Sequence, residues 1–148
     1  MTTVIIDYNS GNLRSAEKSF QLMSEELNLG KVKVSNKPED VVNADRVVLP
    51  GVGAFADCKH ELSSIMGLYE AIEAHVKTGK PFMGICVGMQ MMANRSEEGI
   101  LPGLGWFDAE VRHFNETDVH QKFNCPHMGW NDVLLIEKDT LFKKLDFP

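Results

Sequence analysis

The stretch FMGICVGMQ, residues 82–90, places one cysteine between two glycines, where a short apolar run gives way to a helix-like sequence. The run Phe82–Ile85 predicts a buried strand. Gly84 and Gly88 lie two residues on either side of Cys86. G-x-C-x-G after a strand is the thiol form of the nucleophile elbow, a sharp turn at the top of an α/β sheet. We therefore predict that Cys86 is a nucleophile.

A structural role for the same residues is the alternative interpretation. Cys86 would then be a small buried side chain, and Gly84 and Gly88 would allow close packing of a helix on the sheet. In the elbow, the two glycines are needed because a larger side chain would strike the backbone of the tight turn. Gln90 on the following helix, and a second glycine loop upstream, favour the elbow.

Strand-like and helix-like segments alternate before the elbow. Strands are predicted at Thr3–Ile6, Lys31–Val34 and Arg46–Leu49, and helices at residues 13–27, from 38, and at 68–76. This rhythm predicts an α/β fold with a mostly parallel sheet and helices on both faces. The turns DYNSGN, PGVGAF and CVGMQ should then meet at the carboxyl edge of the sheet, where such folds bind ligands.

The pattern changes after about Arg95. Four glycine and proline residues fall between Gly99 and Gly105, and the segments 106–114 and 133–136 resemble shorter, antiparallel strands. The chain has no internal repeat and no evident boundary, so we expect residues 1–148 to form one domain.

Composition narrows the class of partner. The 148 residues are 43% hydrophobic and 24% charged, and they carry a formal charge of −6 without a cluster of Lys or Arg. We expect no nucleic-acid partner, no membrane span and a cytoplasmic location. The three cysteines are too widely spaced for a disulfide framework or a metal site, so no metal or cofactor is expected.

The loop LPGVGAFA, residues 49–56, also fits the dinucleotide fingerprint G-x-G-x-x-A through Gly51, Gly53 and Ala56. That fingerprint requires an acidic residue about 20 positions later at a strand end. The candidates, Glu70 and Glu73, fall inside a predicted helix, so the context argues against a dinucleotide site.

A second use of this loop is to stabilise an oxyanion. Acyl transfer from a thiolate needs N–H donors aimed at the tetrahedral oxygen. The amides of Val52 or Gly53, together with the Val87 amide after the nucleophile, would supply them. The simpler alternative is that Pro50-Gly51 only turns the chain.

Four segments together carry a family resemblance. DYNSGNLRSAEKSF, LPGVGAFADC, PFMGICVGMQMM and PHMGWNDV resemble, in this order, the glutamine amidotransferase subunits of imidazole glycerol phosphate synthase, which are class I (triad) amidotransferases. The resemblance covers nearly the whole chain and implies a flavodoxin-like α/β fold. Asn9 departs from the pattern, since glycine is more usual there.

The resemblance implies a set of roles. Cys86 would attack the side-chain amide of L-glutamine and release ammonia to a (β/α)₈ cyclase subunit, which forms imidazole glycerol phosphate in histidine biosynthesis. Gln90 and Gly51 would bind the substrate. Asn12 and Trp130 would lie toward the cyclase, as in a heterodimer.

Such a thiolate works with a histidine that moves protons and a carboxylate that orients it. Family members carry both in a C-terminal His-Pro-Glu stretch, and no His-x-Glu occurs in these 148 residues. Of the five histidines, His127 is the least implausible substitute. We therefore expect the chain to be the N-terminal part of a longer protein and to be inactive alone.

Three other functions stay open at this point. The chain could be a scaffold that binds the cyclase without hydrolysing glutamine. It could be an amidotransferase of another pathway, such as surface-sugar biosynthesis. It could also be a different cysteine hydrolase on the same architecture, because a fold does not fix a function.

Overall fold

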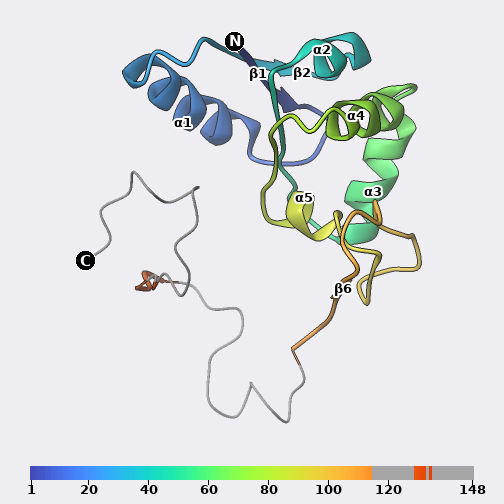
Figure 1. Ribbon diagram of the computed structural model, residues 1–148. Coiled ribbons are helices and arrows are strands. Elements are labelled where there is room, and N and C mark those ends of the chain that lie inside the picture. Colours follow the sequence, from blue (N-terminus) through green and yellow to red (C-terminus); the bar gives the residue numbers. More distant parts are fainter. Residues whose placement is uncertain (115–128, 133, 135–148) are drawn as a thin grey trace. The chain divides into compact units, whose positions relative to one another are not determined.

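The parallel strands predicted from the sequence form the sheet that positions the candidate nucleophile. The computed structural model describes residues 1–114, 129–132 and 134 (Figure 1). Within them the sheet order is β2-β1-β3-β4, with all three pairings parallel. The elements are β1 (Thr2–Ile6), α1 (Leu13–Glu26), β2 (Lys31–Ser35), α2 (Pro38–Asn43), β3 (Arg46–Leu49), α3 (Phe55–Ser64), α4 (Leu68–Lys77), β4 (Phe82–Gly84), α5 (Val87–Gln90), β5 (Arg95–Ser96) and β6 (Glu110–Val111).

The pairing of the strands brings the three predicted turns together. Val47 of β3 pairs with Val4 of β1 on one side and with Phe82 of β4 on the other. Because the strands are parallel, the turns after Ile6, Leu49 and Gly84 leave the same edge of the sheet. The α/β fold and the convergence of these turns are confirmed.

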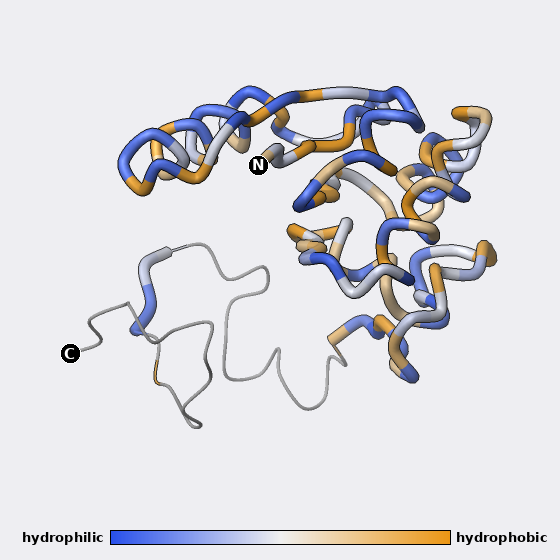
Figure 2. The backbone as a smooth tube through the Cα atoms, turned by 45° about the horizontal axis from the view of Figure 1, so that its top comes forward, coloured by the Kyte–Doolittle hydropathy of each residue, from blue (hydrophilic) through white to orange (hydrophobic). Residues whose placement is uncertain are grey.

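Helices cover the two faces of this sheet unequally. In Figure 1, α1 lies on one side, against β1 and β2, and α2, α3 and α4 lie on the other. Hydrophobic and hydrophilic residues alternate along α1 (Figure 2), and the only buried residue of that helix is Ser24. The main core therefore lies beneath α2, α3 and α4.

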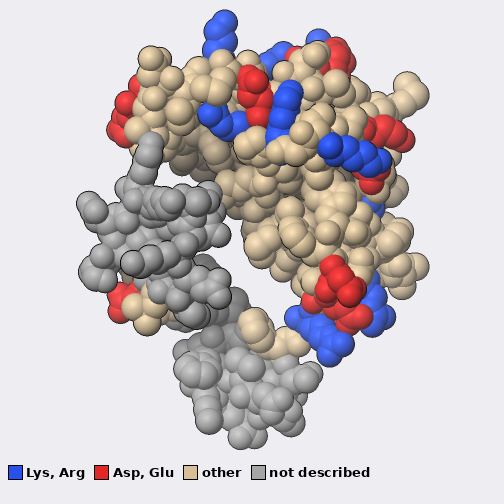
Figure 3. All heavy atoms as spheres, viewed as in Figure 1, with Lys and Arg blue, Asp and Glu red and all other residues tan. Residues whose placement is uncertain are grey.

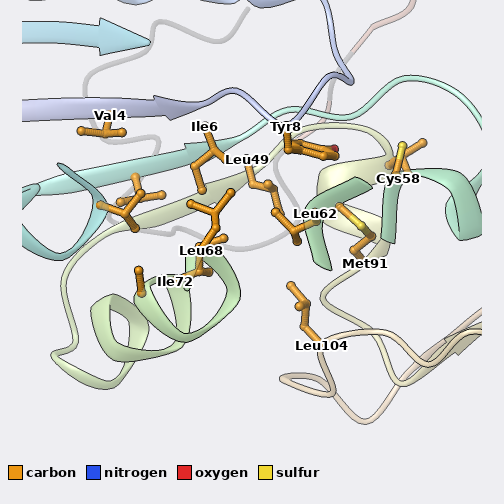
Figure 4. Close-up of a cluster of buried hydrophobic side chains, with 14 of the residues drawn as sticks. Val4, Ile6, Tyr8, Leu49, Cys58, Leu62, Leu68, Ile72, Met91 and Leu104 are labelled. Atoms are coloured by element: carbon orange, nitrogen blue, oxygen red, sulfur yellow. The ribbon is translucent and has the colours of Figure 1, made fainter. Parts of the chain in front are cut away.

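That core follows the alternation of the strands. Val4 and Ile6 of β1 and Leu49 of β3 point to the same side and pack with Leu62 and Ile72 of the helices (Figure 4). Burying a side chain of this size stabilises the folded state by about 1.5–3 kcal/mol. Tyr8, Cys58 and Met91 group at one end of the core (Figure 4).

Helix α3 was not predicted from the sequence. Its signal was present, because Phe55, Cys58, Lys59 and Leu62 recur at the spacing of a helical face and are all buried. The glycine loop just before it also fits the dinucleotide fingerprint. That interpretation loses its acidic residue, since Glu70 and Glu73 lie on α4.

The region after Arg95 differs from the expectation of antiparallel strands. β5 and β6 form a parallel pair, in which Arg95 is opposite Glu110 and Ser96 is opposite Val111. An ion pair of 2.5 Å between Arg95 and Glu110 ties the two strands together. The predicted strand at 133–136 lies outside the described residues, apart from Leu134, which belongs to no strand.

The glycines of 99–105 serve a close approach of two backbones. The amides of Leu104 and Gly105 donate to the carbonyls of Met91 and Ala93, at 2.7 and 3.1 Å. A Cβ at Gly103 would lie 2.0 Å from the Ala93 carbonyl oxygen, so only glycine fits there. This segment braces the chain that follows α5.

The chain divides into two compact units, Met1–His113 and Phe114–Pro148. All strands and helices named above belong to the first unit. A single domain over residues 1–148 stays a prediction.

Candidate active site

The backbone at Cys86 has the strained turn expected of a nucleophile elbow. Cys86 follows β4, precedes α5 and has φ 54° and ψ −118°, a conformation that non-glycine residues rarely adopt. Such strain persists only where the surrounding structure imposes it. Cys86 is also exposed, whereas Cys58 is buried. A buried structural role for Cys86 is therefore wrong.

The glycines flanking Cys86 are required by crowding, as predicted. A Cβ at Gly84 would lie 2.6 Å from the Cα of Met89, and one at Gly88 would lie 1.9 Å from the carbonyl oxygen of Leu49. Both distances are far below an ordinary van der Waals contact. The absence of two side chains thus lets the elbow fold against itself and against the end of β3.

Cys86 opens into a pocket of about 300 Å³ between α1 and the loop after β3. Polar and apolar side chains of α1 form one wall of this pocket. The complete lining is Asn12, Ser15, Ala16, Ser19, Phe20, Pro50, Gly51, Val52, Ile85 and Cys86. Asn12 also caps α1, because its Oδ1 accepts the amide of Ser15 at 3.3 Å. The structure thus brings Cys86, Gly51, Val52 and Asn12 to one site.

The loop after β3 is held by a residue that sequence reasoning missed. The Ser10 hydroxyl donates to the Val52 carbonyl at 2.7 Å and accepts from the Val52 amide at 3.1 Å. The Cys58 thiol donates to the same carbonyl at 3.5 Å and lies 3.1 Å from the Ser10 hydroxyl. Both the amide and the carbonyl of Val52 are therefore hydrogen-bonded within the protein.

Tyr8 fixes the start of that loop. Its hydroxyl donates to the carbonyl of Pro50 at 2.5 Å, and the side chain is fully buried. Burial, with a smaller contribution from neighbouring Cys58, raises the pKa of Tyr8 well above its ordinary value. Tyr8 therefore stays a neutral donor across the pH range in which proteins are folded.

The three predicted oxyanion donors are not equivalent. The Val52 amide is occupied by Ser10, whereas the amides of Gly53 and Val87 donate to no group among the described residues. Val87 is the first residue of α5, and an amide at that position has no acceptor within the helix. In this conformation Gly53 and Val87 are the available donors.

Gln90 lies on α5, one turn after Cys86, and is half-buried. Its Oε1 atom is buried without a hydrogen-bond partner among the described residues. A buried amide oxygen without a partner is costly, and a bound donor would relieve that cost. The predicted substrate role of Gln90 is compatible with this orphaned atom.

The histidines do not complete the site within the described part of the chain. None of the residues that line the Cys86 pocket is a histidine. His75 is buried on α4 with its Nε2 3.2 Å from the carbonyl of Pro81. His127 lies outside the described residues.

Comparison with protein families decides the relationship. The model of the class I glutamine amidotransferase family matches residues 4–147. The chain belongs to this family.

Curated relatives place this amidotransferase more closely. It is 55% identical to imidazole glycerol phosphate synthase subunit HisH of Cereibacter sphaeroides over 90% of this chain and 63% of the relative. It is 48% identical to the subunit HisH of Ruegeria pomeroyi, over 96% of this chain and 67% of the relative. It is 45% identical to the subunit HisH of Rhizobium meliloti, over 96% of this chain and 66% of the relative. The chain thus spans about two thirds of the length of these relatives.

The surface of this amidotransferase carries charges of both signs. On the face in Figure 3, Lys and Arg side chains lie among Asp and Glu side chains. An uncharged area separates the charged groups at the top of the view from those at the lower right. No group of three or more potential metal ligands occurs within residues 1–114 or the short described segments beyond them. Nor does any helix of these ranges have the length and hydropathy to cross a membrane.

Trp130 lies in the second unit, and its predicted place at a partner interface stays a prediction. Asn9, by contrast, has a structural explanation. It has φ 63°, in the left-handed region, where glycine is unstrained and asparagine is better tolerated than most residues. That backbone explains why glycine is usual at this position.

Proposed function

We propose that this amidotransferase hydrolyses L-glutamine to glutamate and ammonia at Cys86, and that it passes the ammonia to a cyclase subunit of imidazole glycerol phosphate synthase in the cytoplasm. The observation that carries the proposal is the exposed thiol of Cys86 on a strained elbow, at the wall of a pocket. The relatives named as subunits of that synthase support the choice of pathway and partner. Because the chain spans about two thirds of their length, the proposal concerns the whole protein.

The proposed reaction proceeds through a thioester. The Cys86 thiolate attacks Cδ of glutamine, and the carbonyl π electrons move to oxygen to form a tetrahedral oxyanion. The oxyanion collapses, the C–N bond breaks, and the nitrogen leaves as ammonia after it takes up a proton. Water then attacks the γ-glutamyl thioester, which releases glutamate and restores the thiol.

Two amides would stabilise the oxyanion. The Val87 amide directly follows the nucleophile, and the Gly53 amide belongs to the exposed part of the loop. A preorganised donor of this kind contributes roughly 100- to 1,000-fold to the rate. The Val52 amide would add to them only if it left the Ser10 hydroxyl.

The polar groups around the pocket have separate proposed roles. Gln90 would bind the substrate through its orphaned Oε1, which accepts an N–H donor such as the α-ammonium group. Gly51 lines the pocket and would contact the substrate through its backbone. Asn12 and Trp130 would contact the cyclase.

Glutamate release tests the proposal. The whole protein is mixed with a cyclase subunit and its ribonucleotide ligand, and glutamate is measured with Cys86→Ala as the variant and Cys125→Ala as the control. We expect turnover that Cys86→Ala abolishes and Cys125→Ala retains. Glutamate release that survives Cys86→Ala would refute the assignment.

A second measurement separates the nucleophile from complete turnover. A glutamine analogue with an electrophilic diazoketone should alkylate Cys86 and add its mass to the peptide that contains residues 82–90. Alkylation restricted to Cys58 would contradict the proposal.

A catalytically silent scaffold is the second candidate. It is favoured by one observation, namely that no described histidine lines the pocket of Cys86. A scaffold would bind the cyclase with the same affinity in the wild type and in Cys86→Ala, and neither form would release glutamate.

A further inference from the structure

A second pocket, on the face of the protein that carries α3 and α4, contains a lysine with no ion pair to another described residue. This pocket measures about 330 Å³ and is lined by Lys59, Ser63, Ile65, Met66, Gly67, Tyr69 and Glu70. It shares no lining residue with the pocket of Cys86. Its volume is at the lower end of the range for small-molecule sites.

Lys59 is unusual for a surface helix. Only 8% of the residue is exposed, and no hydrogen bond or ion pair joins it to another described residue. Its ammonium lies 4.4 Å from the centre of the Tyr69 ring, which is a cation–π contact. The aliphatic stem of Lys59 accounts for this burial, and its ammonium lines the pocket. An anion in the pocket would lie within reach of this charge.

The first turn of α4 supplies further donors at the same place. Gly67 caps this ten-residue helix without a side-chain hydrogen bond, and the Leu68 amide donates to the carbonyl of Ile65 at 3.1 Å. The next two amides, of Tyr69 and Glu70, donate to no group among the described residues. Free amides at a helix start, with the positive end of the helix dipole, favour an anion.

The acidic side chains nearby limit the kind of anion. Glu73 is already engaged, because its carboxylate accepts from Lys77 at 3.2 Å and from the Tyr69 hydroxyl at 3.2 Å. Glu70 is exposed at the pocket and accepts no hydrogen bond from a described residue. With the Ser63 hydroxyl, it is suited to the hydroxyl groups of a ligand.

We propose that this pocket binds a small hydroxylated phosphate monoester, with its phosphoryl group on Lys59 and the amides of Tyr69 and Glu70. A lysine ammonium beside free helix amides is a combination that phosphate groups prefer. The hydroxyl groups of the ligand would face Glu70 and Ser63. Tyr69 and Met66 would cover its carbon atoms.

The ionisation of Lys59 agrees with this geometry. Burial lowers the pKa of its ammonium group, and the charge of Glu73 only partly offsets that effect. A bound dianion would oppose this lowering, because a nearby negative charge favours the charged ammonium.

Titration of the 148-residue chain, labelled with ¹⁵N, tests the site. The ligands are glucose 6-phosphate, inorganic phosphate and glucose, and the amide shifts of Tyr69 and Glu70 are followed. We expect saturable shifts with glucose 6-phosphate, weaker binding of inorganic phosphate and none with glucose. Shifts that cluster away from α4, or no saturable shift with either phosphate, would overturn the proposal.

Two variants sharpen the test. Lys59→Met keeps the aliphatic stem and should weaken the binding of glucose 6-phosphate at least tenfold. Lys18→Met on α1 should change this affinity less than twofold. Equal affinity in Lys59→Met would refute the site.

Glu70→Gln is exposed and should fold even if Lys59→Met does not. It should strengthen the binding of inorganic phosphate and reduce the preference for glucose 6-phosphate over inorganic phosphate. An unchanged preference would contradict the assignment of Glu70.

Discussion

Replacing Gly88 by alanine gives two opposite expectations, which makes it a sharp test of the elbow. Gly88 lies in helix α5, and helix propensity alone predicts that alanine stabilises the protein by about 1 kcal/mol. The structure predicts the reverse, because the new Cβ would lie 1.9 Å from the Leu49 carbonyl oxygen and 2.8 Å from its carbon. Both obstacles are backbone atoms, so α5 or the end of β3 must move. Overpacking typically costs about 1–3 kcal/mol and occasionally more, and a clash with two backbone atoms places Gly88→Ala at the upper end of that range.

Gly79→Ala is the matched control for this prediction. Gly79 has φ 73° and nothing within 4 Å of its Cβ position, so only the left-handed backbone opposes a side chain there. That strain costs about 1–2 kcal/mol. Urea unfolding followed by far-UV circular dichroism should rank Gly88→Ala as clearly more destabilised than Gly79→Ala. If Gly88→Ala matches or exceeds the wild type in stability, the steric account of the elbow is wrong.

Three further perturbations test the loop and the sheet. Ser10→Ala should speed hydrogen exchange of the Val52 amide by about 2- to 10-fold, because one net hydrogen bond is lost; an unchanged rate would exclude Ser10 as its partner. Tyr8→Phe should lower the free energy of unfolding in urea by about 1–3 kcal/mol, because a buried carbonyl loses its donor; no loss would contradict this. The hydrogen bond from Lys33 lowers the pKa of Asp40, so its contribution to stability is full above the ordinary carboxyl pKa and is lost as the pH falls through the lowered value. The urea midpoint of Asp40→Asn should therefore fall less steeply in acid than that of the wild type, and equal slopes would argue against this ion pair.

The sequence was sufficient for features that depend on local spacing. The βαβ rhythm, the glycines beside Cys86 and the turns at one sheet edge follow from periodicity and backbone sterics over a few residues. Helix α3 had the same kind of signal through Phe55, Cys58 and Leu62.

Contacts between distant segments could not be predicted in this way. Ser10 and Val52 are 42 residues apart, and only the pairing of β1 with β3 brings them together. The burial of Lys59 also depends on tertiary structure, since a lysine on an amphipathic helix is usually exposed. The parallel pairing of β5 with β6 is equally non-local, because the two strands are separated by the segment that braces the chain after α5.

Gly51 and Gly88 meet back to back, since a Cβ at Gly51 would lie 2.6 Å from the Gly88 amide nitrogen. The loop and the elbow therefore share one contact surface, although they come from different βα units. Since both residues are already glycine, neither can be enlarged and compensated by a smaller partner, so neutral drift through these two positions is closed. Gly53 differs from both: its Cβ position has open space, but its φ of 112° favours glycine, so a side chain there would strain the loop backbone without striking the elbow.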